Sequence, residues 1–122
     1  MNELIDIEVR YEDEPDDEVL GILTEVGAER ITANEGLGMT GGEIVAAIIV
    51  VRLLADLVVK LTQLFSSGIV VDARGPKLKI QKNPSLPRGA VLVINREGVQ
   101  VTFKDPSAPL IESLTGLFKS SY

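Results

Sequence analysis

The sequence contains neither cysteine nor histidine. Without cysteine the chain has no disulfide, no thiolate nucleophile and no thiolate metal ligand. Without histidine it has no imidazole to pair with a nucleophile, to transfer protons near pH 7 or to bind zinc or copper. Carboxylate, lysine or tyrosine chemistry and hard cations such as Mg²⁺ or Ca²⁺ remain. We therefore expect no enzyme activity, no catalytic or metal-binding residues and no cofactor.

Aromatic residues are also scarce, with three Phe, two Tyr and no Trp. The chain thus offers no aromatic platform on which bases or sugars would stack, and its net charge of −6 disfavours binding to nucleic acid. The opening residues Met1-Asn2-Glu3 have neither the positive charge nor the apolar stretch of a secretory signal. These features favour a cytoplasmic protein whose partners are other proteins.

Charge is distributed unevenly along the chain. Residues 1–43 contain thirteen acidic and two basic residues, a sum of −11, whereas residues 44–122 contain five acidic and ten basic residues, a sum of +5. Two interpretations are open. In the first, each part solvates its own surface. In the second, the acidic part attracts either the basic part of another copy, head to tail, or a basic partner protein.

The length of 122 residues fits one domain, 1–122, with its own core. Apolar runs bounded by Gly and Pro predict strands, which are expected at residues 4–11, 28–33, 69–73, 77–82, 90–94 and 99–104. Two short helices are expected, one from Pro15 to Val26 and one that ends at Phe118. We expect residues 119–122 to form a loose tail.

The longest expected element is a helix over residues 43–65. It opens with eight consecutive apolar residues, 44–51, and polar residues then recur at helical spacing, at Arg52, Asp56, Lys60 and Gln63. Everything outside this polar stripe is apolar, which is the reverse of an ordinary surface helix. The three charges near its centre make insertion into a membrane unfavourable.

A helix with this much apolar surface has two possible surroundings. In one, the sheet and the short helices of its own domain cover it. In the other, part of it is covered by a partner protein or a second copy. The residues expected at such an interface are Ile44, Ile48 and Val51, together with Leu37 and Met39 of the preceding loop.

A glycine-rich loop precedes this helix. Residues 36–41 match the GxGxxG pattern of dinucleotide-binding loops that connect a strand to a helix. However, Glu43 in the first helical turn would repel a phosphate, and no strand-end acidic residue follows at the usual spacing of about 20 residues. We interpret Gly36, Gly38, Gly41 and Gly42 as a hinge, with a small-ligand or nucleotide site as the alternative.

Two further charge clusters have structural interpretations. The acidic residues at 12–18 lack the ligand spacing of a calcium loop and fit the solvated start of a helix. Lys77 and Lys79 alternate with the apolar Leu78 and Ile80, as in an exposed edge strand that is protected against aggregation.

In the order of its expected elements, the chain resembles the effector-associated constant component domains of prokaryotic conflict systems. The resemblance rests on Gly38-Met39-Thr40-Gly41-Gly42 leading into an aliphatic helix, followed by β-hairpins and a short final helix. These are small α/β or α+β proteins encoded beside caspase-like or trypsin-like peptidases and other effectors. The resemblance covers most of the chain and implies a non-enzymatic adaptor in antiviral defence, between a sensor or NTPase and an effector. The acidic first helix and the loop from Pro84 to Pro87 depart from it, and it assigns no functional residues.

Together these features predict an α+β domain in which a mixed five- or six-stranded sheet packs on one long apolar helix, with two shorter helices beside it. The expected function is a protein-binding adaptor or scaffold that self-associates and has an effector protease among its partners. The alternatives are a small-ligand or nucleotide module that uses the Gly36–Gly42 loop and a membrane-associating component that uses helix 43–65.

Overall fold

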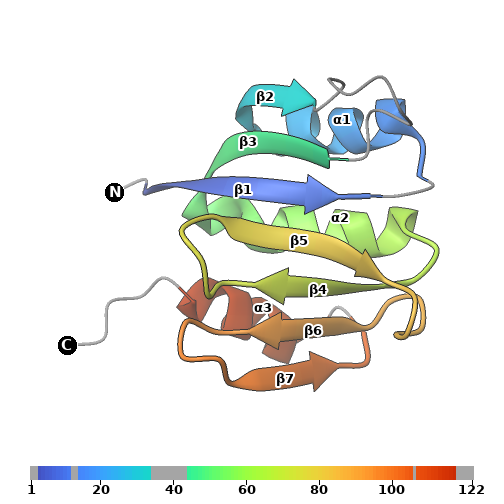
Figure 1. Ribbon diagram of the computed structural model, residues 1–122, viewed down its shortest axis with the longest axis vertical. Helices are drawn as coiled ribbons and strands as arrows, with labels where there is room; N and C mark the ends of the chain where they lie inside the picture. Colours follow the sequence, from blue (N-terminus) through green and yellow to red (C-terminus); the bar gives the residue numbers. More distant parts are fainter. Residues whose placement is uncertain (1–2, 12–13, 34–43, 106, 118–122) are drawn as a thin grey trace.

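The computed structural model describes residues 3–11, 14–33, 44–105 and 107–117. These residues form seven strands, three α-helices and one 3₁₀ turn, η1 (Figure 1). In chain order they are β1 (Leu4–Arg10), α1 (Asp16–Glu25), β2 (Glu29–Ala33), β3 (Ile44–Val50), η1 (Val51–Leu53), α2 (Leu54–Leu64), β4 (Gly68–Asp72), β5 (Leu78–Asn83), β6 (Val91–Ile94), β7 (Gln100–Phe103) and α3 (Ala108–Gly116).

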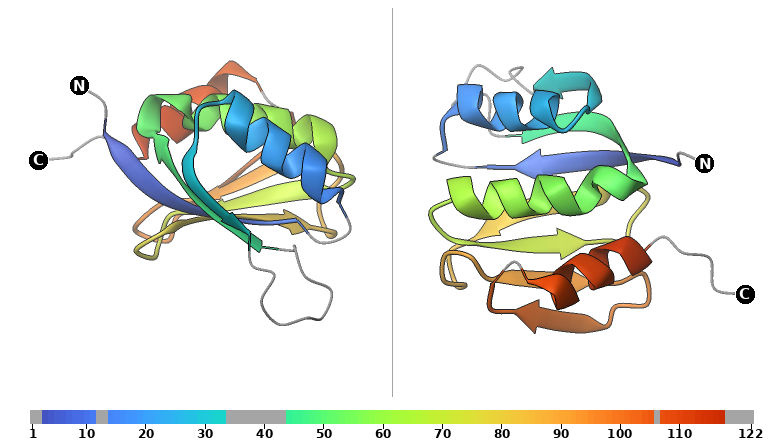
Figure 2. Two further views of the ribbon diagram at one scale, coloured as in Figure 1. Left: turned by 90° about the horizontal axis from the view of Figure 1, so that it is seen from above. Right: turned by 180° about the vertical axis from the view of Figure 1, so that it is seen from behind.

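The seven strands join in one mixed sheet with the order β2-β3-β1-β5-β4-β6-β7. β1 with β5 and β4 with β6 are parallel pairs, and the other neighbours are antiparallel. All three helices lie on one face of the sheet, with α2 across the middle, α1 towards β2 and α3 towards β7 (Figure 2). The fold is therefore α+β and has two layers, as expected in outline from the sequence.

The core lies between the sheet and the helices. Alternate strand residues point into it, such as Ile7 and Val9 of β1 and Val45 of β3, each with no exposed surface. Leu57 and Leu61 of α2 meet them and are also fully buried. Burial of aliphatic side chains is the dominant favourable contribution to the stability of such a core, at roughly 25 cal/mol per Å² of apolar surface.

The prediction of one long helix over residues 43–65 is wrong for the first part of that range. Residues 44–50 form β3 in the interior of the sheet, and helical structure begins only with η1 and α2. Most residues of this run are β-branched, and they fit a pleated sheet better than a helix, where their side-chain torsions are restricted. The run gives the sheet a seventh strand where five or six were expected. The membrane-associating alternative depends on a helix that β3 and α2 replace.

The polar stripe expected from the sequence is confirmed where helical structure does occur. Asp56 and Gln63 of α2 are exposed and Lys60 is partly exposed, while Arg52 is exposed on η1. No helix in the described ranges has the length and apolar character needed to span a membrane.

The edge position expected for residues 77–82 is also wrong. β5 lies in the middle of the sheet, between β1 and β4. The expected alternation is confirmed, since Leu78 and Ile80 are buried and Lys79 is exposed. The parallel pairing of β1 with β5 joins segments about 70 residues apart in the chain, and such pairing has no local sequence signal.

The other expected strands and helices are confirmed with small shifts at their ends, including the stop of α1 before Gly27, whose φ is +89°. Several expectations lie outside the described residues. They concern the glycine loop with Gly36, Gly38, Gly41 and Gly42, the interface residues Leu37 and Met39, and the tail 119–122.

Candidate functional site

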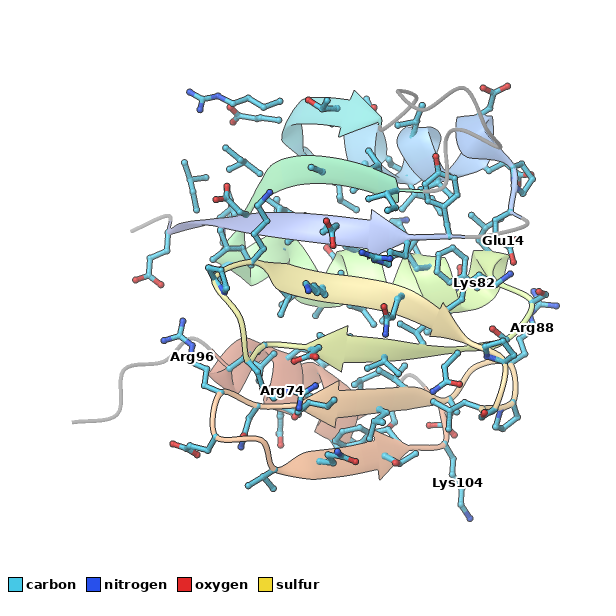
Figure 3. The ribbon with its side chains drawn as sticks, viewed as in Figure 1. Glu14, Arg74, Lys82, Arg88, Arg96 and Lys104 are labelled. Atoms are coloured by element: carbon cyan, nitrogen blue, oxygen red, sulfur yellow. The ribbon has the colours of Figure 1, made fainter. Side chains whose placement is uncertain are left out.

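The second face of the sheet points away from the helices, and we call it the open face. No helix or strand formed by the described residues covers it (Figure 2). Figure 3 views the molecule from this side. The strand register places on it Leu4, Asp6, Glu8 and Arg10 of β1, Ile44, Ala46, Ile48 and Val50 of β3, Lys79 and Gln81 of β5, Val70 and Asp72 of β4, and Leu92 and Ile94 of β6.

One part of the open face is apolar. Leu4 lies opposite Val50 in the register and is 57% exposed, the largest exposed fraction among the large apolar side chains of the described ranges. The four β3 residues of the open face are all partly exposed. We call these five residues the β3 patch: Leu4, Ile44, Ala46, Ile48 and Val50. A contiguous group of exposed apolar side chains is typical of a surface that contacts another molecule.

Two of the interface residues expected from the sequence belong to the β3 patch. A spacing of four residues places Ile44 and Ile48 on one face in a helix and in a strand alike, so they stay together although the expected helix is wrong. Val51 lies outside the patch, at the start of η1. Its backbone N–H donates a hydrogen bond to the carbonyl oxygen of Glu3 at 2.8 Å, which ties the end of β3 to the start of β1.

The surface beside the patch is hollowed. A depression of about 170 Å³ is lined by Ala46 and Ile48 of the patch and by the charged residues Asp6, Arg30 and Lys77. It has an apolar floor with charges of both signs at its rim. This combination suits a protruding side chain of a protein better than a compact charged ligand.

A band of charged residues crosses the middle of the open face. Glu8 of β1 lies opposite Lys79 of β5, which in turn lies opposite Asp72 of β4. Arg74 holds Asp72 in a fork, with N–H···O distances of 3.0 Å and 2.8 Å to its two carboxylate oxygens. The Nε atom of Arg10 is 3.6 Å from Oε1 of Glu8. We call Glu8, Arg10, Asp72, Arg74 and Lys79 the charged band.

The two carboxylates of the band differ in their surroundings. The hydrogen bonds from Arg74 outweigh the effect of burial and, with the charges of Arg74 and Lys79, hold the pKa of Asp72 below its usual value. Glu8 is less well satisfied, because its Oε1 atom is shielded from solvent and accepts no hydrogen bond from the described residues.

The charge asymmetry of the sequence becomes an asymmetry across the sheet. β2, β3 and β1 come from the first 50 residues, whereas β5, β4, β6 and β7 come from residues 68–103. On the open face, β1 carries Asp6 and Glu8, while Lys77 and Lys79 lie at the start of β5 and within it. Figure 3 labels five cations in the second half of the sheet and its connections: Arg74, Lys82, Arg88, Arg96 and Lys104.

A larger cavity of about 490 Å³ lies at one end of the sheet. Leu4, Asp6, Arg74, Leu78 and Arg96 are among its lining residues. Arg74 is engaged by Asp72, so its charge is already compensated. The lining mixes both charge signs with aliphatic side chains, which favours no class of small ligand over another.

Glu14 and Lys82 form a nearly buried ion pair, with side chains 7% and 12% exposed. They lie side by side in Figure 3. Oε2 of Glu14 is 2.8 Å from Nζ of Lys82 and accepts hydrogen bonds from the backbone N–H and the hydroxyl of Ser66, at 2.9 Å and 3.1 Å. Burial alone would raise the pKa of Glu14, but these hydrogen bonds and the charge of Lys82 together lower it below its usual value.

This cluster contains the residue types of a serine–lysine hydrolase, since Oγ of Ser66 is 3.4 Å from Nζ of Lys82. A lysine that acts as the base in such a site must be neutral. Nζ of Lys82 is instead paired with Oε2 of Glu14 at 2.8 Å, and the same oxygen accepts the two hydrogen bonds from Ser66. We therefore interpret the three residues as a clamp that joins the segment before α1 to the end of α2 and to β5.

The described residues contain no group of three or more acidic side chains placed to hold a metal ion. Comparison with protein-family models, with curated proteins and with solved structures gives no match in any of the three.

Proposed function

We propose that the chain is a non-enzymatic protein-binding scaffold that self-associates by packing the open face of its sheet on the open face of a second copy. The observation that carries this proposal is the combination of the β3 patch with the charged band on a face that no described element covers. An apolar patch next to fixed charges suits a protein surface, because the patch supplies the driving force and the charges supply the orientation.

The order of charges across the open face favours a second copy as the partner. A two-fold axis parallel to the strands, between β1 and β5, would place each β1 over β5 of the other copy. Asp6 and Glu8 would then face Lys77 and Lys79 of that copy. In this arrangement β3 lies over β4 of the second copy, with Ile44 level with Val70 and Ala46 level with Asp72. Two sheets pack in this way at about 10 Å.

The same arrangement adds a second cation near Glu8. Arg10 already lies 3.6 Å from its carboxylate, and Lys79 of the second copy would come opposite it. The interface expected from the sequence at Ile44 and Ile48 uses the same surface. The attraction between acidic and basic parts acts here across a two-fold axis and not head to tail. An effector protein, the partner that the family resemblance implies, would then bind elsewhere on the assembled scaffold.

The test is the solution mass by light scattering over a wide concentration range. We expect the unaltered chain to associate and Ile48→Glu to be monomeric with an unchanged circular dichroism spectrum. Ile111→Glu is the matched control, because Ile111 is 41% exposed on α3, far from the open face in the fold. A chain that stays monomeric at every concentration contradicts the proposal, and so does an Ile48→Glu variant that associates as well as the Ile111→Glu control.

A charge exchange tests the orientation. Glu8→Lys alone brings like charges together in the proposed dimer and should weaken association, and Lys79→Glu alone should do the same. The double variant Glu8→Lys/Lys79→Glu restores the opposite signs across the two-fold axis and should recover it. Loss in both single variants without recovery in the double variant would rule out this orientation.

A further inference from the structure

The two edge strands of the sheet differ in how they are protected. β2 carries Glu29 and Arg30, its register with β3 shifts between Glu29 and Thr32, and Arg30 has a φ of +53°. Charges and an irregular backbone are the devices by which proteins prevent a further strand from adding to a sheet. The β2 edge is therefore closed to further pairing.

β7 has none of these features. Its residues, Gln100–Phe103, are uncharged and pair with β6 in an unbroken register. Val101 on this strand and Val99 just before it are 47% and 56% exposed. Neither side chain has the cover that apolar residues of a sheet usually receive.

The hydrogen-bonding direction along β7 can be worked out from its hairpin with β6. The N–H of Asn95 donates to the carbonyl of Val99 at 3.0 Å, so the backbone carbonyl of Val99 points towards β6. Because bonding alternates along an antiparallel strand, the N–H and C=O groups of Gln100 and Thr102 point away from β6. No other described strand lies on that side of β7.

We propose that β7 pairs antiparallel with β7 of a second copy, with Val101 opposite itself on a two-fold axis. In this register Gln100 of each copy exchanges backbone hydrogen bonds with Thr102 of the other. Val99 then lies opposite Phe103, so each apolar residue meets an apolar residue and each polar one a polar one. Lys104 lies opposite Gly98 of the second copy, and the two ammonium groups are at opposite ends of the pair. No other register that pairs the outward-facing groups matches all these residues.

This surface is separate from the open face and stands without the proposed function. A strand of four residues gives an interface well below the size of stable complexes, so pairing through β7 alone should be weak. A dimer formed through the open face would carry two free β7 edges. The two contacts together would extend the scaffold into larger assemblies.

Cysteine cross-linking tests the register, because the chain contains no cysteine of its own. In the proposed pair the two Val101 residues are not hydrogen-bonded to each other, so their Cα atoms lie about 4.5 Å apart, within reach of a disulfide. The two Val99 residues are offset by four positions along the strand, or about 13 Å. Both side chains are exposed to a similar extent, which makes Val99→Cys the matched control.

With oxidised glutathione, we expect Val101→Cys to form a disulfide-linked dimer at least ten times faster than Val99→Cys. Equal rates, or no cross-link in either variant, would overturn the proposal. Adding Thr102→Pro to Val101→Cys removes one outward N–H without removing a bond to β6, and should reduce the rate to that of the control. Adding Ile48→Glu to Val101→Cys instead should leave the rate of cross-linking unchanged. If this double variant no longer cross-links, the contact depends on the open face and not on β7 alone.

Discussion

The two faces of the sheet are built from the same strands, yet they have different chemistry. On the covered face, every second residue of β1 and β3 is aliphatic, and all of them except the partly buried Ile5 are almost without exposed surface. On the open face, the residues between them are of two kinds. Most of those on β1 are charged, and those on the neighbouring strand β3 are aliphatic. The helices make one face a core that has to be apolar. The other face is free of that requirement, and the proposed function accounts for its apolar residues by contact with a second copy.

Matched substitutions on neighbouring residues of β3 should show the largest difference between the faces. Val45 is fully buried and Ile48 lies on the open face. Val45→Glu places a charge in the core, and we expect it to lower the free energy of unfolding by at least about 4 kcal/mol or to prevent folding. Ile48→Glu should change it by about 1 kcal/mol or less. Urea unfolding followed by circular dichroism measures both, and equal losses would contradict the division into a core face and a contact face.

The clamp between Glu14 and Lys82 belongs to the covered side, and its loss should have the next largest effect. Lys82→Met leaves the carboxylate of Glu14 nearly buried without its cation, which costs about 3 kcal/mol of unfolding free energy in comparable pairs. Glu14→Gln/Lys82→Met removes both charges and should recover most of the loss. A double variant no more stable than Lys82→Met would mean that Lys82 acts through packing on Phe65 rather than through the ion pair.

Acid should affect both faces, through Glu14 on the covered side and Asp72 on the open face. The pKa of each carboxylate in the folded chain lies below its ordinary value of 4.5 or 3.8. The unfolded chain therefore binds more protons in this range, so these groups contribute stability above their ordinary pKa values that is lost as the pH falls through the lowered ones. Urea midpoints from about pH 6 to about pH 2.5 should decline, and Glu14→Gln should flatten the decline more than Asp72→Asn, since Asp72 pairs with an exposed arginine.

The smallest effect on stability is expected in the charged band. Lys79→Ala removes an exposed charge and should change the free energy of unfolding by no more than about 0.5 kcal/mol. Its effect on self-association should be larger, because Lys79 would face Glu8 of the second copy. Lys104→Ala, on the far edge of the sheet, is the control and should leave open-face association unchanged (Figure 3). The solution mass of both variants is measured by light scattering at low and high salt. A Lys104→Ala variant that associates as weakly as Lys79→Ala would contradict the proposed contact between Lys79 and Glu8 of the second copy.

The elements that can be predicted from the sequence are those in which apolar and polar residues recur at a regular spacing. The alternation in β1 and the four polar positions from Arg52 to Gln63 are such patterns, and both agree with the structure. The residues from Ile44 to Val51 are all apolar and show no regular alternation with polar ones, so their pattern does not distinguish a strand from a helix. Because the run continues directly into the helical pattern that follows, it is assigned to the same helix although most of its residues are β-branched. Two residues of the β3 patch, Ile44 and Ile48, could be predicted only because a spacing of four residues places them on one face in a helix and in a strand.

The rest of the open face could not be predicted, because it depends on which strands become neighbours. Glu8 and Lys79 meet through the parallel pairing of β1 with β5, and Lys79 meets Asp72 through the pairing of β5 with β4. Without the strand order, Lys77 and Lys79 are typical of an edge strand. The clamp at Glu14, Ser66 and Lys82 likewise joins three distant segments, and none of them has a motif that indicates the others.

The division of the sheet into an early and a late half affects the order in which the protein forms on the ribosome. β1, β2 and β3 are complete once residue 50 has been made, but the other side of β1 has no neighbour until β5 follows at residues 78–83. At about 5–20 residues per second, that gap lasts roughly two to seven seconds. During this time β1 is an open strand edge, and its alternating charges at Asp6, Glu8 and Arg10 disfavour pairing with other nascent chains. The residues proposed to orient two finished copies would thus also keep unfinished ones apart.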